Sequence, residues 1–197
     1  MKRRAKSNIM HICYIGNRNT GKTTRLKKIF LIALASKVGP IIILDSAVEE
    51  GNKSLINQLR QEGYQGHYFV FRDKEDINSF KKGFSENKMK SVPFYCDVSY
   101  CLERGHEARG LSENKWRNLY KDLVSDIVEV VLSQDWPVTT TPCFILDEIE
   151  INERAGWQLL AGLSQIHIAL AIHSNFYIAS PELLKAMKVV NLVFKYR

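Results

Sequence analysis

The chain alternates between short apolar runs and longer segments of mixed polarity. The apolar runs predict strands at 9–15, 41–45, 67–71, 92–98, 143–147, 166–172 and 189–195. The segments between them predict helices at 22–37, 52–63, 76–84, 111–134, 152–164 and 181–187. The run "IIILD" is continuously apolar, as expected for a strand that is buried on both faces of a sheet. Strands that alternate with helices over short connections predict an α/β fold, with a mostly parallel sheet flanked by helices.

The length and the uniform texture of the chain indicate one domain. The 197 residues are enough for one well-packed domain and too few for two large ones. There are no internal repeats, low-complexity tracts or Gly/Ser linkers, and the one irregular segment is the polar "SYCLERGHEARGL" at 99–111. We therefore expect a single domain over 1–197.

The sequence "GNRNTGKT" at 16–23 lies between the first predicted strand and the first predicted helix. It matches G-x-x-x-x-G-K-[ST], in which glycines let backbone N–H groups point at a phosphate. Lys22 would place its charge on the β and γ oxygens, and Thr23 would offer its hydroxyl to Mg²⁺. The pattern predicts ATP and Mg²⁺ as cofactors. The predicted nucleotide-binding residues are Gly16, Asn17, Arg18, Asn19, Thr20, Gly21, Lys22, Thr23 and Thr24.

Two carboxylates end the apolar run of "PCFILDEIE". Asp147 and Glu148 would emerge at the carboxyl end of a buried strand, where open α/β sheets bind their ligands. Asp147 is positioned to hold Mg²⁺ through water, and Glu148 to act as the general base for an attacking water. The predicted metal-binding residues are therefore Thr23 and Asp147.

Together these motifs resemble the additional-strand branch of P-loop NTPases, in which a catalytic Glu follows the Mg²⁺-binding Asp. The order of elements from 166 onward is similar to the FtsK/HerA superfamily of DNA-pumping motors. In that superfamily an Asn or Gln at the end of the next strand senses the γ-phosphate, and Asn175 matches it best, with His173 and Ser174 beside it. The Asp that ends "IIILD" is another similarity.

The size of the chain is similar to that of the compact genome-packaging ATPases of membrane-containing and archaeal viruses. The resemblance implies a RecA/FtsK-like three-layer sandwich, a homo-oligomeric ring and double-stranded DNA as partner, with viral capsid or membrane-associated proteins as further partners.

One feature departs from this family. The superfamily usually carries an arginine just before the sensor strand that reaches into the neighbouring subunit, whereas this chain has "GLSQIHIAL" there. Arg154, Arg104 and Arg109 are the available substitutes, and Arg154 is our candidate for catalysis in trans.

Charge is consistent with an anionic partner. The formal net charge is +7, from 28 Lys and Arg against 21 Asp and Glu. Such an excess suits nucleic acid or an anionic membrane surface. The basic ends "MKRRAK" and "VFKYR" are equally consistent with phosphate contacts and with solvated chain ends.

The cysteines and the apolar stretches predict a cytoplasmic protein, which would be virion-associated if the system is viral. Cys13, Cys96, Cys101 and Cys143 form no CxxC pair, so we expect reduced thiols. The stretch "IFLIALA" is only about a third of a membrane span. We therefore expect no transmembrane segment.

Three functions remain open on the sequence alone. The leading one is an ATP-hydrolysing motor subunit that moves DNA in viral genome packaging. A small-molecule kinase is the second, because 101–117 is arginine-rich and has glycines that could hinge a lid. A nucleotide-gated interaction module is the third. Glu148 argues against the second and the third, and the "HSN" that ends the 166–172 strand also argues against a kinase.

Overall fold

The structure is a computed structural model that describes residues 9–37, 39–88, 92–100, 113–137, 139–173, 181–187 and 191–192. Its strands are β1 His11–Gly16, β2 Ile41–Asp45, β3 His67–Val70, β4 Phe94–Asp97, β5 Cys143–Asp147, β6 His167–His173 and β7 Asn191–Leu192. Its helices are α1 Lys22–Ser36, the 3₁₀ helix η1 Val48–Lys53, α2 Leu55–Gln61, α3 Lys74–Asn87, α6 Glu113–Leu132, α7 Glu153–Gly162 and α8 Pro181–Ala186.

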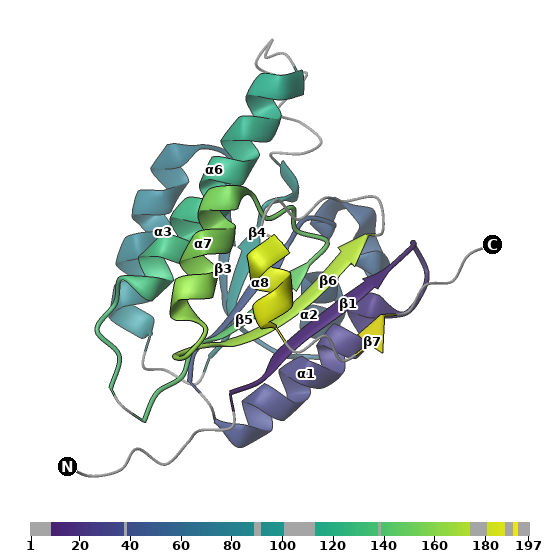
Figure 1. Cartoon of the computed structure of the whole chain (residues 1–197), viewed down its shortest axis with the longest axis horizontal. Helices are drawn as coiled ribbons and strands as arrows, with labels where there is room; N and C mark the ends of the chain where they lie inside the picture. The colour runs from purple at the N-terminus through teal and green to yellow at the C-terminus, as the bar shows by residue number, and fades with distance from the viewer. Residues whose placement is uncertain are drawn as a thin grey trace.

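The described strands form one seven-stranded sheet in the order β3-β4-β2-β5-β6-β1-β7. Every paired neighbour is parallel. Helices cover both faces, and Figure 1 shows α3, α6 and α7 gathered on one side while α1 crosses the other. The predicted α/β fold with a parallel sheet flanked by helices is confirmed.

The continuous apolar runs are explained by burial on both faces. In β5, Phe144 and Leu146 pack with α3, α6 and α7, whereas Cys143 and Ile145 pack with α1 and α2. The side chains of β2 alternate between the same two groups of helices. Alternate side chains of a strand point to opposite faces, so a central strand with helices on both sides must be apolar at every position.

The segment after β2 differs from the prediction. A single helix was expected over 52–63, but the chain first forms η1, kinks at Gly51 (φ 65°) and begins α2 only at Leu55, with Ser54 as its N-cap. The buried carboxylate of Asp45 causes this path. It accepts hydrogen bonds from the Ala47 N–H (2.8 Å), the Ser54 hydroxyl (2.7 Å) and the Ile56 N–H (3.0 Å).

The thiols that the structure describes are free and buried, as expected. Cys13, Cys96 and Cys143 form no disulfide, and Cys101 lies outside the described residues. Burial raises the pKa of the Cys13 and Cys143 thiols to about 12, so both behave as small apolar residues. Within the described part of the chain, no helix combines the length and apolar character that a membrane span requires.

His167 makes the stability of the fold sensitive to acid. Its Nδ1 accepts a hydrogen bond from the Met10 N–H at 3.0 Å, and burial, with a smaller contribution from His11, lowers the pKa of His167. The neutral ring therefore belongs to the folded state. Stability from this group is complete above the unfolded pKa of about 6.5 and is lost as pH falls through the lowered folded pKa.

We therefore expect the contribution of His167 to the free energy of unfolding to fall between about pH 7 and pH 5 in the wild type. His167→Asn keeps an acceptor oxygen for Met10 and cannot titrate, so its loss over the same interval should be smaller. Urea unfolding at a series of pH values measures the difference. Identical pH slopes in the two proteins would contradict this role for His167.

Candidate functional site

The glycine-containing loop joins β1 to α1 at the carboxyl edge of the sheet. Asn19 (φ 64°) and Gly21 (φ 79°) have left-handed backbones, which let the chain curl tightly before the helix. Gly21 is the N-cap residue, and its carbonyl accepts the first helical hydrogen bond from the Arg25 N–H at 3.1 Å. The free N–H groups of the first turn of α1 therefore adjoin the loop, as an anion site requires.

Lys22 lies beneath this loop with its ammonium group almost wholly buried. Its Nζ donates to the carbonyls of Gly16 (2.9 Å) and Asn17 (2.8 Å), and it lies 3.4 Å from Glu148 Oε1. Only 6% of its side chain is exposed. A positive charge is thus held at the centre of the loop by groups that a phosphate oxygen could replace.

Asp147 ends β5 beside the start of α1. Its carboxylate accepts a hydrogen bond from the Thr23 side chain, but its Oδ1 is buried and has no hydrogen-bond partner. Burial, followed by the nearby charge of Asp45, raises the pKa of Asp147 well above its usual range, while the Thr23 hydrogen bond opposes the rise. A buried carboxylate oxygen without a partner is costly unless a cation compensates it.

This donor set fits Mg²⁺. The Thr23 hydroxyl and the Asp147 carboxylate are hard oxygen ligands, and Mg²⁺ typically takes one or two such protein groups together with phosphate oxygens and water. The described residues contain no cluster of three or more His, Cys, Asp or Glu side chains that could hold a metal. Thr23 and Asp147 are the residues of this site that would hold such an ion.

Glu148 follows Asp147 in a strained conformation. Its φ of 55° is in the left-handed region, which is uncommon for residues other than glycine. Two hydrogen bonds hold it there, because its N–H donates to the Ala171 carbonyl (2.8 Å) and its carbonyl accepts from the Ser46 hydroxyl (3.0 Å). The result directs a partly exposed carboxylate towards Lys22.

These groups share a cavity of about 400 Å³, within the usual range for small-molecule sites. The loop and the two carboxylates form one wall, and η1 and α2 form the other. The lining residues are Arg18, Asn19, Thr20, Gly21, Lys22, Thr23, Thr24, Ala47, Glu50, Asn52, Lys53, Gln58, Asp147 and Glu148. Gly16 and Asn17 are not in this set, but their carbonyls accept hydrogen bonds from Lys22, which is.

The wall formed by η1 and α2 was not predicted. Glu50 lies 3.5 Å from Arg18 of the loop and 3.4 Å from Lys53, so an ion-pair network joins the two walls. Asn52 and Gln58 complete this side. Nothing in the residue pattern of 48–58 marks these side chains, because their position depends on the kinked path that Asp45 imposes.

One strand, β6, separates the loop strand β1 from the acidic strand β5. In register, His173 pairs with Gly16, and Ala171 pairs with Asp147. Neighbouring strands lie about 4.8 Å apart, so the backbones of β1 and β5 are roughly 10 Å apart, and the side chains of Lys22 and Glu148 meet across the end of β6. The predicted sensor Asn175 follows two residues later and lies outside the described residues.

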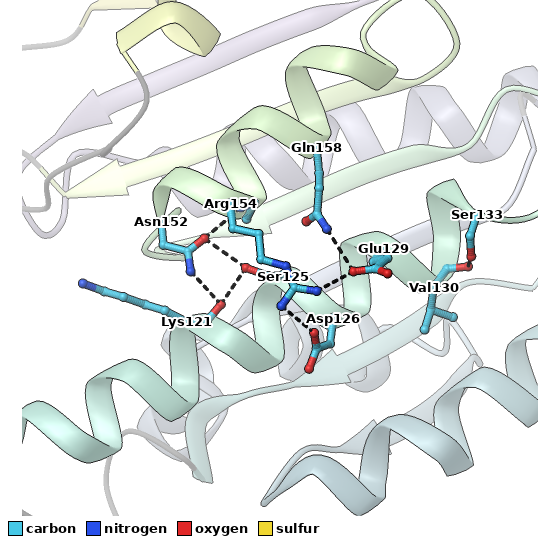
Figure 2. Close-up of polar contacts among 10 residues, drawn as sticks. Lys121, Ser125, Asp126, Glu129, Val130, Ser133, Asn152, Arg154 and Gln158 are labelled. Atoms are coloured by element: carbon cyan, nitrogen blue, oxygen red, sulfur yellow. Dashed lines mark hydrogen bonds and ion pairs between the residues drawn. The ribbon is translucent and has the colours of Figure 1, made fainter.

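Arg154 lies in the first turn of α7 and does not line the cavity. Figure 2 shows its guanidinium reaching across to α6, where it pairs with Asp126 (3.0 Å) and Glu129 (2.5 Å). About half of its side chain is exposed. A role in trans would require Arg154 to leave both carboxylates, and that role stays a prediction. Arg104 and Arg109 lie outside the described residues.

Comparison with known proteins adds no family. No protein-family model matches the chain, and no curated protein matches it in sequence.

Asp147→Asn should separate the stability of the site from its chemistry. Because the pKa of Asp147 is raised in the fold, its carboxyl destabilises the ligand-free fold increasingly as pH rises above the unfolded pKa of about 3.9, so the variant should gain roughly 1–3 kcal/mol at neutral pH. The gain should shrink as pH falls towards that unfolded pKa, where the carboxyl is protonated in both states. The variant should also lose Mg²⁺-dependent nucleotide binding. Urea unfolding and calorimetric titration measure the two effects.

Asp135 is exposed, so Asp135→Asn is the matched control. It should alter neither the free energy of unfolding nor Mg²⁺-dependent nucleotide binding. A less stable Asp147→Asn that binds Mg²⁺ and nucleotide normally would contradict the metal assignment.

Proposed function

We propose that this chain is a Mg²⁺-dependent ATPase of the P-loop type, from the additional-strand branch. The observation that carries the proposal is the convergence of four groups at one cavity: the buried Lys22 ammonium, the Thr23 hydroxyl, the unpartnered Asp147 oxygen and the strained Glu148. These are the cation, the metal ligands and the base that hydrolysis of a phosphoanhydride requires.

Each residue has a step that follows from its contacts. Lys22 exchanges the Gly16 and Asn17 carbonyls for β- and γ-phosphate oxygens, while the N–H groups at the start of α1 cradle the phosphates. Thr23, and Asp147 through water, would hold Mg²⁺, which when bound supplies charge neutralisation at the phosphate oxygens. Glu148 accepts the proton of the attacking water.

The strand order supports the same branch. The additional strand that gives the branch its name separates the loop strand from the acidic strand, and β6 has that place here. Lys22 and Glu148 form a 3.4 Å ion pair and both line the cavity, so a γ-phosphate would take the place of the Glu148 carboxylate beside Lys22 and leave Glu148 facing the attacking water. Glu148 at this place favours water as the acceptor of the γ-phosphate over the hydroxyl of a second substrate.

We further propose that ATP hydrolysis drives movement of double-stranded DNA by a homo-oligomeric ring, as in viral genome packaging. Support comes from the resemblance of the motifs to the FtsK/HerA superfamily and from the net charge of +7. In such a ring Arg154, or another arginine, completes the neighbouring site.

DNA should therefore raise the rate of ATP hydrolysis. We expect stimulation that is similar for unrelated duplex sequences, because a motor must contact the backbone and not base edges. Stimulation should fade steeply as salt rises, because phosphate contacts release counterions. Phosphate release measured across a salt series, with two unrelated duplexes, checks both points.

The dependence on protein concentration should be steeper than linear, since a site completed by a neighbour works only in the assembled ring. A monomer whose rate is indifferent to DNA and salt would contradict the motor proposal and leave the ATPase proposal standing. Phosphate transfer to a nucleoside in an acceptor panel, in place of phosphate release, would favour a kinase.

A further inference from the structure

We infer that Ser46 is a positioning residue that sets the backbone, and through it the carboxylate, of Glu148. This inference rests on the proposed ATPase function. Ser46 is absent from the residues that line the cavity, so it acts through Glu148 and not through contact with a nucleotide.

The register of the sheet brings Ser46 and Glu148 together. Asp45 of β2 pairs with Asp147 of β5, so each following residue leaves the sheet beside the other. The Ser46 N–H donates to the Asp147 carbonyl at 3.4 Å, and the Ser46 hydroxyl donates to the Glu148 carbonyl at 3.0 Å. The chain after β5 is therefore fastened directly to the chain after β2.

The conformation that these contacts hold is one that a glutamate does not adopt readily. A left-handed backbone at a residue other than glycine persists only where its surroundings enforce it. At Glu148 the enforcement has two parts on opposite sides, the Ala171 carbonyl of β6 and the Ser46 hydroxyl after β2. Loss of the Ser46 hydroxyl leaves only the bond to the Ala171 carbonyl, so the backbone of Glu148 can relax and turn the carboxylate away from Lys22.

Ser46 is itself held rigidly, as a positioning residue must be. Its neighbour Asp45 is fully buried and binds the Ala47 N–H, the Ser54 hydroxyl and the Ile56 N–H. These three contacts fix the chain on the C-terminal side of Ser46 against the end of β2. The hydroxyl of Ser46 is thus presented to Glu148 from a preorganised segment.

Ser46→Ala tests the inference in the full chain, with ATP and Mg²⁺ as the probe. We expect kcat to fall roughly tenfold, the effect of about one lost hydrogen bond, with KM and the Kd for Mg·ADP unchanged. Ser46→Thr keeps the hydroxyl and should restore most of the rate. Ser46→Cys keeps the shape with a much weaker donor and should behave like Ser46→Ala, which guards against a folding defect in one variant.

Two comparisons separate positioning from a general structural effect. Ser125→Ala removes another buried hydroxyl, bonded to Asn152 and to the Lys121 carbonyl between α6 and α7 (Figure 2), and should leave kcat unchanged. Ser46→Ala added to Glu148→Gln should cost no further rate, because a residue that acts through Glu148 has nothing left to position.

The outcomes are distinguishable. A wild type without ATPase activity removes the proposed function, and this inference with it. An active wild type with normal kcat in Ser46→Ala, or a further loss in the double variant equal to that of Ser46→Ala alone, overturns the role of Ser46 and leaves the ATPase proposal intact.

Discussion

Lys22→Ala is expected to abolish the proposed ATP hydrolysis and most nucleotide binding, because it removes the one buried cation in a loop otherwise built from backbone dipoles. Lys22 Nζ lies between two loop carbonyls and 3.4 Å from Glu148, so no other described side chain takes its place without rearrangement. Loss of one preorganised charged or donor group typically costs roughly 10²–10³ in rate. Steady-state phosphate release and calorimetric titration with Mg·ATP measure the two losses.

Lys82→Ala is the matched control, since it deletes an exposed lysine of α3 on the opposite side of the sheet. It should leave both quantities unchanged. Hydrolysis at the wild-type rate by Lys22→Ala would remove the phosphate-loop assignment altogether.

Glu148→Gln separates binding from chemistry. The amide keeps the shape of the side chain and cannot accept the proton of water, so we expect hydrolysis to slow by roughly 10²–10⁴ while Mg·ATP still binds. The variant should therefore trap a stable ATP complex, measurable as nucleotide retained after gel filtration. Because the backbone bonds to Ala171 and Ser46 do not involve the carboxylate, the local conformation should persist.

Glu150→Gln is the matched control two residues away. Glu150 pairs with Lys121 of α6 at 3.5 Å and does not line the cavity. Its change should leave the rate at the wild-type level. If Glu148→Gln hydrolysed ATP normally, Glu148 would not be the base, and the kinase alternative would gain support.

Most of the fold could be predicted from the sequence because the apolar runs and the glycine-containing motif are both local features of the chain. Continuous apolar runs such as 41–45 and 143–147 mark strands buried on both faces, and the structure has β2 and β5 at those residues. The predicted phosphate loop is equally local, since a strand followed within a few residues by a helix already brings Lys22 and Thr23 to one place. The strand order is a property of long-range packing, and no pattern within the chain specifies it.

The opposite wall of the site could not be predicted, for the same reason. The path of 46–56 depends on three hydrogen bonds to Asp45, a residue that from the sequence is only the polar end of a strand. The strain at Glu148 likewise depends on Ser46 and Ala171, which are distant in sequence. The pairing of Arg154 with Asp126 and Glu129 on α6 could not be predicted either, because no sequence pattern links residues on two different helices.

The most direct test of the proposed ATPase is steady-state phosphate release from ATP by the purified chain, with Mg²⁺ and with Mg²⁺ removed by chelation. We predict a rate that requires both Mg²⁺ and the Glu148 carboxylate, and that falls to background in Lys22→Ala. Absence of phosphate release above buffer at any protein concentration, with or without DNA, or a rate unaffected by chelation and by both substitutions, would contradict it.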